Sequence, residues 1–182
     1  MTDRFDVDPT RAVVLPSDFT TGIVEHYAFD GTAAVERAAA VCQAARQAAV
    51  PVIHVAPGRL DPKNPVAQFH PAITPVEGDT VVNKTRIGAF STTGLDVQLR
   101  ASGRDIVVLM GIATSGTVLS SARWAYDLGY KIVVVADACS DPDPEVHRIL
   151  TEPVHDASWI GLWRLADVVT AESMIATLTR RT

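Results

Sequence analysis

The chain has 182 residues, 47% hydrophobic and 20% charged, with a formal net charge of -5 at pH 7. This balance is typical of a globular chain with a substantial core, and it argues against intrinsic disorder. A mildly acidic chain offers no basic surface, so we expect neither nucleic acid nor a membrane as a partner. No apolar run approaches the roughly 20 residues that span a bilayer.

The two cysteines, Cys42 and Cys139, are far apart and form no C-x-x-C pair. This pattern is typical of a reducing compartment rather than of a disulfide framework. The first ten residues, MTDRFDVDPT, are polar and acidic, unlike a secretory signal. We therefore expect a cytoplasmic protein.

Short β-branched runs alternate with longer stretches that carry helix signals. The apolar residues of these runs are nearly continuous, which is typical of a parallel sheet covered on both faces. Pro16, inside the first strand, removes a ladder N–H and predicts a strained or edge-like strand end. The six runs are AVVL (12–15), PVIHV (51–55), VVNK (81–84), DIVVLM (105–110), KIVVVA (131–136) and DVVTA (167–171).

The intervening stretches read as helices. An Ala-rich stretch at 32–49 has high helix propensity, 94–103 and 116–129 follow the third and fourth strands, and a helical tail begins at Glu145. Alternation of strand and helix predicts right-handed crossovers. We therefore expect one domain over residues 1–182: an α/β fold, a three-layer α/β/α sandwich with a Rossmann-like six-stranded parallel sheet. The long irregular stretch 56–80 is expected to help form a binding site or an oligomer contact.

Three polar features fall at the carboxyl ends of predicted strands, the edge where open parallel sheets bind ligands. Asp18 follows the first strand, Lys84 closes the third, and GIATSGT (111–117) joins the fourth strand to its helix. Singly, each has a structural explanation: a turn aspartate, a solvated lysine, and a turn with Thr114 as helix N-cap. Together, at one edge, they predict a ligand site.

The segment from VVNKTRIGAFSTTG through DIVVLMGIATSGTVLSSARWAYDLG to KIVVVADAC (81–139) resembles the central block of isochorismatase-like hydrolases, the cysteine hydrolase superfamily. The likeness extends from Ala12 to about Leu178. It implies the isochorismatase-like fold and an active site at Asp18, Lys84 and the position that Thr117 occupies, where the family carries its nucleophilic cysteine.

The resemblance also implies a cis peptide bond between Ile112 and Ala113. These two residues would contribute to substrate or oxyanion binding, and Phe19 and Phe90 would flank the centre by analogy. Phe19, Phe90 and Ile112 each have a core-packing alternative.

Thr117 in place of cysteine changes the chemistry. A helix N-terminus helps a thiol to ionise, but it contributes only about 0.3–1 kcal/mol, far too little to ionise an alcohol. Cys42 lies on the apolar stripe of its helix, and Cys139 has no nucleophilic role in the family pattern. The isochorismatases proper, by resemblance, hydrolyse a vinyl ether without this cysteine, which would make Asp18 a general acid.

No metal or cofactor is expected. His54, Asp61 and His70 are widely spaced, and the chain contains no H-E-x-x-H motif and no glycine-rich phosphate loop. Trp124, Trp159 and Trp163 favour core or subunit contacts, and the family commonly forms homodimers or larger homo-oligomers.

Three functions stay open. The first is a hydrolase acting on a small carboxylate-bearing substrate, at a vinyl-ether or C–N bond, with acid/base chemistry by Asp18 and Lys84. The second is an amidase with Thr117 as nucleophile. The third is a catalytically silent binding or structural homologue in which the two charges form only an ion pair.

Overall fold

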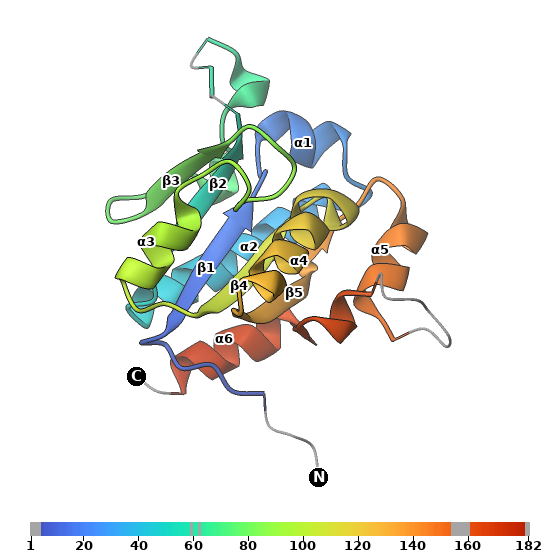
Figure 1. Ribbon diagram of the computed structural model, residues 1–182. Helices are drawn as coiled ribbons and strands as arrows, with labels where there is room; N and C mark the ends of the chain where they lie inside the picture. Colours follow the sequence, from blue (N-terminus) through green and yellow to red (C-terminus); the bar gives the residue numbers. More distant parts are fainter. Residues whose placement is uncertain (1–4, 59, 62, 154–160, 181–182) are drawn as a thin grey trace.

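The computed structural model describes residues 5–58, 60–61, 63–153 and 161–180. Within them, six parallel strands form one sheet in the order β3-β2-β1-β4-β5-β6, with helices on both faces (Figure 1). The predicted three-layer α/β/α sandwich is therefore confirmed. The strands are β1 (Ala12–Ser17), β2 (Ile53–Pro57), β3 (Thr80–Lys84), β4 (Ile106–Ile112), β5 (Lys131–Ser140) and β6 (Asp167–Val169).

The helices follow the predicted stretches, with two differences. The short helix after β1 was not predicted, and the helix expected at 116–129 begins with a π-helical turn, Thr114–Val118. The helices are α1 (Thr21–His26), α2 (Gly31–Gln47), α3 (Leu95–Ala101), α4 (Leu119–Asp127), α5 (Pro144–Thr151) and α6 (Ala171–Thr179). Among the residues described, no helix is long and apolar enough to cross a membrane.

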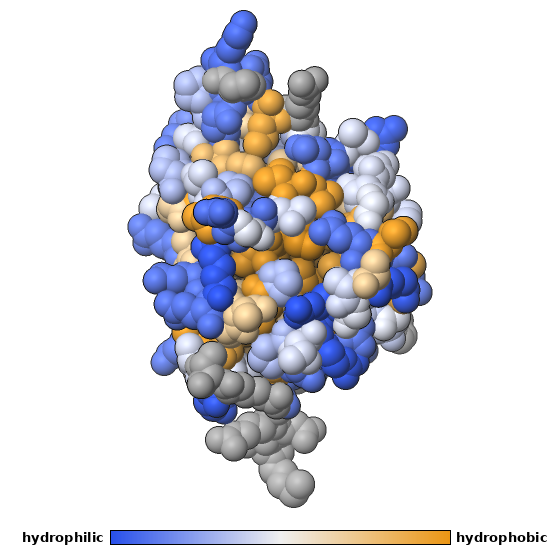
Figure 2. Space-filling view, turned by 90° about the vertical axis from the view of Figure 1, so that its left-hand side faces the viewer, coloured by the Kyte–Doolittle hydropathy of each residue, from blue (hydrophilic) through white to orange (hydrophobic). Residues whose placement is uncertain are grey.

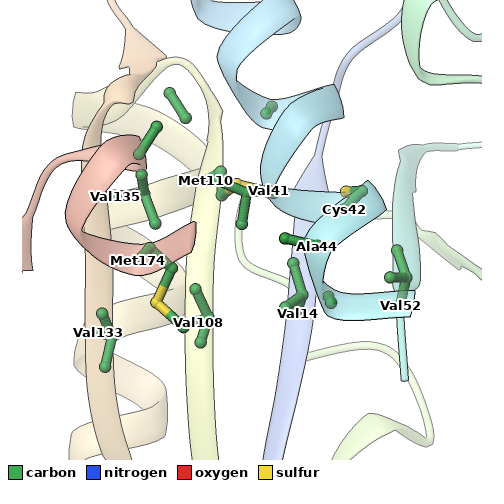
Figure 3. Close-up of a cluster of buried hydrophobic side chains, with 14 of the residues drawn as sticks. Val14, Val41, Cys42, Ala44, Val52, Val108, Met110, Val133, Val135 and Met174 are labelled. Atoms are coloured by element: carbon green, nitrogen blue, oxygen red, sulfur yellow. The ribbon is translucent and has the colours of Figure 1, made fainter. Parts of the chain in front are cut away.

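Two hydrophobic clusters fill the sandwich because successive strand residues point to opposite faces. In β1, Val14 faces the cluster beneath α2 and α6, whereas Val13 and Leu15 face the cluster beneath α3, α4 and α5. Figure 3 shows the first cluster, where Val41 of α2 and Met174 of α6 meet the sheet. Both faces of the central strands are therefore buried, as their continuous apolar runs predicted.

The prediction of an edge-like end at Pro16 is wrong, because β1 lies in the middle of the sheet. The β1–β4 ladder runs unbroken from Ala12 to Ser17. Towards β2, the Val14 N–H donates to Pro51 O, two residues before β2, and the Asp18 N–H donates to Val55 O, each over 2.9 Å. In a parallel sheet, alternate residues of a strand donate to the same neighbouring strand. Pro16 lies between Val14 and Asp18, so its missing N–H removes a hydrogen bond only between β1 and β2.

Figure 2 looks onto the side of the molecule that carries edge strand β3 and shows an apolar area surrounded by hydrophilic residues. Strand β3 and helix α3, which Figure 1 shows on this side, each carry an exposed valine: Val81 at 39% and Val97 at 72%. The sheet order places Lys84, the last residue of β3, two strands away from Asp18.

Candidate active site

Asp18 and Lys84 meet at the carboxyl edge of the sheet, above the end of β2. The Lys84 Nζ lies 2.8 Å from Asp18 Oδ2, and both side chains are buried. Asp18 has a left-handed backbone conformation with φ 61°, which Asp tolerates better than most residues. Its N–H donates to Val55 O over 2.9 Å, which attaches it to β2. The structure thus brings these two predicted site residues together.

The turn after β4 carries the third predicted residue. A cis peptide joins Ile112 and Ala113, as the resemblance implied, and the π-helical turn Thr114–Val118 follows. Ala113, not Thr114, is the N-cap residue of this turn. Gly111 has no room for a side chain, because an added Cβ would lie 2.5 Å from Ser17 O. This close approach brings the turn next to Asp18.

Asp18 is buried with only part of its hydrogen-bonding capacity used. Among the described residues, Asp18 Oδ1 and Thr117 Oγ1 are both buried without a hydrogen-bond partner. Burial raises the pKa of Asp18 to about 6, while the Lys84 ammonium and the nearby Thr117 hydroxyl act in the opposite direction. A carboxyl with this pKa exchanges its proton near neutral pH, so it suits general acid–base chemistry.

The two cysteines lie in the hydrophobic core. Cys42 belongs to the cluster beneath α2, and Cys139 is buried near the end of β5. Burial raises the pKa of each thiol to about 12. Because the thiolate is the nucleophilic form, neither residue has the environment of a reactive cysteine.

The predicted flanking residues divide between the two faces of the sheet. Phe19, Ile112 and Ala113 belong to the cluster beneath α2. Phe90 belongs to the opposite cluster, where its ring centroid lies 5.7 Å from that of Tyr130. The long segment before β3 also reaches this region, since His70 N–H donates to Phe19 O over 2.9 Å.

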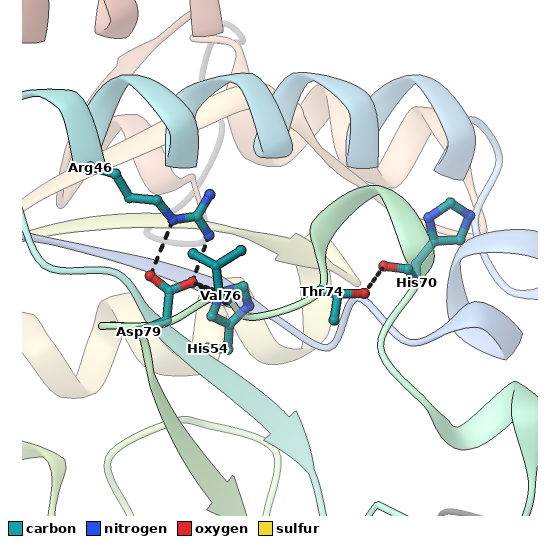
Figure 4. Close-up of polar contacts among 6 residues, drawn as sticks. All are labelled: Arg46, His54, His70, Thr74, Val76 and Asp79. Carbon is teal, nitrogen blue, oxygen red and sulfur yellow. Dashed lines mark hydrogen bonds and ion pairs between the residues drawn. The ribbon is translucent and has the colours of Figure 1, made fainter.

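A second buried carboxylate, Asp79, lies directly before β3, at the amino-terminal ends of the strands, opposite to the end that carries Asp18 (Figure 4). It accepts hydrogen bonds from Arg46 Nε and Nη2, at 3.1 and 2.6 Å, and from the Val76 N–H at 3.1 Å. His54 Nε2 lies 3.0 Å from Oδ2 and is the donor, because an ionised carboxylate only accepts. These donors hold the pKa of Asp79 below its usual value, and burial lowers the pKa of His54.

The residues weighed as metal ligands have other partners. His54 binds Asp79, His70 accepts the Ala72 N–H at 3.3 Å, and Asp61 accepts the Lys63 N–H at 2.9 Å. Within the ranges that the structure describes, no group of three or more His, Cys, Asp or Glu side chains is arranged to hold a metal ion.

Two polar residues near the turn were missed by the sequence reasoning. Asp141 accepts the Ser115 N–H at 2.8 Å, and His147 Nδ1 lies 2.8 Å from Thr114 Oγ1. The rule that led to Asp18 and Lys84 applies equally to Asp141, which follows β5 at the same edge. His147 had no such signal, since its position depends on how α5 packs.

Among the tryptophans, Trp124 on α4 is 47% exposed, whereas Trp163 is partly buried and has the Arg164 guanidinium over its ring. Trp159 lies outside the described residues.

Residues 12–173 match the isochorismatase domain family, and the chain belongs to this family. A structure of an isochorismatase family protein from Burkholderia thailandensis is 32% identical, with a TM-score of 0.82, over 96% of this chain and 98% of that one. The resemblance stated from the sequence is therefore confirmed.

Several curated relatives are similar to the chain. YwoC, an uncharacterised isochorismatase family protein of Bacillus subtilis, is 47% identical over 45% of this chain and 43% of its own length. A maleamate amidohydrolase of Pseudomonas putida is 33% identical over 71% of this chain and 70% of the relative. A probable isochorismatase of Pseudomonas chlororaphis is 30% identical over 94% and 88%, respectively. The match thus spans about half of YwoC and more of the other two.

Proposed function

We propose that the chain is a hydrolase in which Asp18, assisted by Lys84, performs acid–base catalysis on a small carboxylate-bearing substrate without a cysteine nucleophile. The observation that carries this proposal is the Asp18 carboxyl itself. It is buried, its Oδ1 has no partner among the described residues, and its pKa is raised to about 6. The buried thiols, whose pKa values are raised to about 12, support chemistry without a thiolate.

For a vinyl ether, the protonated Asp18 carboxyl would act as general acid. Its proton passes to the terminal enol carbon, which leaves an oxocarbenium ion at the ether carbon. Water adds to that carbon and returns a proton to the Asp18 carboxylate, and the hemiketal collapses to an alcohol and a keto acid such as pyruvate. The similarity to a probable isochorismatase supports this reaction.

For a C–N bond, the Asp18 carboxylate would act as general base. It removes a proton from the attacking water and then returns that proton to the leaving nitrogen, so that the tetrahedral intermediate expels ammonia or an amine. The similarity to a maleamate amidohydrolase, which by its name acts on a small amide, supports this branch. Backbone N–H groups of the turn after Ile112 would hold the oxyanion.

Lys84 has one role in both reactions and a second role in the vinyl-ether reaction. In the free protein its ammonium stabilises the Asp18 carboxylate across 2.8 Å. A substrate carboxylate bound at Nζ would share that positive charge, so the pKa of Asp18 would rise and a larger fraction of the residue would hold the proton that a general acid donates. This explains why a small acid is the expected substrate.

A product screen on the purified chain tests the proposal. Isochorismate and maleamate are supplied separately, and pyruvate and ammonia are read in parallel with Asp18→Asn as control. Either product from the wild type and not from Asp18→Asn supports the proposal. Product formation that Asp18→Asn leaves unchanged overturns it, and silence with both substrates favours a binding homologue.

A second candidate, an amidase acylated at Thr117, is favoured by one observation: the buried Thr117 Oγ1 without a partner lies near a carboxyl of raised pKa. This mechanism predicts that Thr117→Val abolishes ammonia release and that Thr117→Cys retains it. Acid–base catalysis with water predicts that Thr117→Val keeps measurable turnover, because the hydroxyl is not attacked.

We also propose that the chain associates with copies of itself. The exposed Trp124 on α4 and Val97 on α3 support an apolar contact surface. Light scattering coupled to size-exclusion chromatography should give at least twice the chain mass of 19.5 kDa, and a Trp124→Glu variant should shift it towards the monomer. A monomeric wild type would contradict this proposal.

A further inference from the structure

Two polar side chains outside the proposed acid–base pair contact the turn that carries Thr117. His147 Nδ1 lies 2.8 Å from Thr114 Oγ1, and the Asp141 carboxylate accepts the Ser115 N–H at 2.8 Å. Thr114 is completely buried and Asp141 is 4% exposed. The turn is thus held at two successive residues by groups from a different part of the chain.

The chain between β5 and α5 places these groups. The β4–β5 register shifts between Leu109 and Gly111, so that Cys139 and Ser140 come to pair with Gly111 and Ile112. Asp141 then follows directly beside the turn. Helix α5 begins at Pro144, with the Asp143 side chain accepting the Glu145 N–H at 2.9 Å as an N-cap.

The two contacts differ in kind. The bond from the Ser115 N–H to a carboxylate is charge-assisted, which makes it stronger than a bond between neutral groups. Burial lowers the pKa of His147, although Asp141 and Glu152 oppose this shift, so the neutral imidazole predominates at neutral pH. A neutral ring has one acceptor nitrogen, and Nδ1 can accept the Thr114 hydroxyl proton, so this buried hydroxyl has a partner.

We propose that His147 and Asp141 are positioning residues, which hold the Thr114–Val118 turn so that the Thr117 hydroxyl faces the Asp18 carboxyl. This inference rests on the proposed function of Asp18. Neither residue touches the acid–base pair; both act through the turn, in which Ser115 is two residues from Thr117. In the proposed function the backbone N–H groups of this turn hold the oxyanion, and a misplacement of about 1 Å can reduce a rate about 10²-fold, so such support matters to turnover.

His147 also lines a pocket of about 260 Å³ together with Phe29, Arg37 and Asp141. Water from this pocket can fill the space of a truncated side chain. We therefore expect His147→Ala to fold, with the Thr114 hydroxyl no longer held by a fixed acceptor.

The test compares His147→Ala with His147→Asn and a matched control, Thr151→Val. Asn places an amide oxygen near the position of Nδ1. The control removes the bond from Thr151 Oγ1 to His147 O, 2.9 Å long, and so weakens α5 without touching the turn. Two readouts are used: the NMR titration of the Asp18 carboxyl carbon, and kcat and KM with the substrate found in the product screen.

His147→Ala should raise the pKa of Asp18, because the Thr117 hydroxyl that lowers it is displaced. It should also lower kcat about tenfold or more with little change in KM. His147→Asn should restore both values, and Thr151→Val should leave both as in the wild type. The proposal is overturned if His147→Ala titrates and turns over like Thr151→Val. The NMR readout needs no substrate, so it separates failure of this proposal from failure of the proposed hydrolase activity.

A double-mutant cycle with Thr114→Val isolates the His147 contact. Valine keeps the shape of threonine and removes the hydroxyl. If the two residues act through their shared bond, the kcat of the double variant should be no lower than the kcat of the more impaired single variant. Losses that multiply would show that His147 acts by another route and would overturn its assignment.

Discussion

Asp18 and Asp79 are two buried carboxylates at opposite ends of the strands of one sheet, and they differ in the number of hydrogen-bond donors that contact them. Asp79 accepts hydrogen bonds from Arg46 and Val76 and is bound by His54, and its pKa lies below the usual value. Asp18 has the single cation Lys84, and its pKa is raised to about 6. Both pairs are ionic, so the number of donors, rather than the presence of a cation, separates the carboxylate of lowered pKa from the carboxylate of raised pKa.

The largest expected effect comes from Asp18→Asn, which keeps the shape of the side chain and removes its exchangeable proton. Loss of a general acid or base typically costs about 10²–10⁴-fold in rate, so kcat/KM should fall by that amount. Steady-state kinetics on the active substrate measures it. A variant that retains wild-type turnover would break the comparison, because Asp18 would then be a structural carboxylate like Asp79.

Asp79→Ala should act on stability instead. It leaves the buried His54 and the half-buried Arg46 without their acceptor, so the free energy of unfolding should fall by about 3 kcal/mol. Urea denaturation followed by tryptophan fluorescence measures this. Asp105→Ala is the matched control: it removes the exposed ion pair with Arg11 and should cost less than about 1 kcal/mol. Equal losses in both variants would contradict a structural role for the Asp79 cluster.

The pH dependence should have opposite signs at the two sites. Asp79 and His54 have lowered pKa values, so their contribution to stability is present at neutral pH and is lost on acidification. It fades first below the ordinary histidine pKa of about 6.5 and then below the ordinary aspartate pKa of about 3.9. Asp18 has a raised pKa, so its ionisation lowers stability as pH rises towards about 6.

The titration of the Asp18 carboxyl should also appear in the pH dependence of kcat/KM, and its direction should show whether Asp18 acts as an acid or as a base. If Asp18 is a general acid, kcat/KM should fall about tenfold per pH unit above pH about 6. If Asp18 is a general base, the fall should occur below that pH instead. A profile that is flat between pH 5 and 8 on the active substrate, about the range that brackets this pKa, would remove Asp18 from the chemistry.

The smallest effect is expected from the thiols. Cys42→Ala and Cys139→Ala each shorten a buried side chain and should cost about 1 kcal/mol of stability. Neither should change kcat, because neither thiol ionises near neutral pH. Loss of turnover in a variant that still folds would point to a cysteine mechanism after all.

The sequence predicted the proposed catalytic site better than the Asp79 cluster for a physical reason. Parallel strands all end at one edge, so Asp18, Lys84 and the Thr117 turn could be placed together from strand positions alone. All six strands were predicted because their apolar runs are continuous. Helix α1 was not, since its six residues are too few to show a helical period.

The contacts that escaped prediction join residues through the packing of separate elements. Asp79 meets Arg46 from the end of α2, and His147 meets Thr114 through α5. Neither pairing follows from strand order or spacing. Pro16 is a similar case within the sheet. The sequence does not show which strands lie beside β1, so it does not show that Pro16 occupies a central strand.

The NMR titration of the side-chain carboxyl carbons of Asp18 and Asp79 in the wild-type protein tests this account most directly, because it requires no substrate. The Asp18→Asn and Asp79→Asn variants assign the two signals. The account predicts a midpoint of about 6 for Asp18 and one below the ordinary value of 3.8 for Asp79. An Asp18 midpoint at or below 3.8 would contradict it, since Lys84 would then hold the residue as a permanently ionised structural partner.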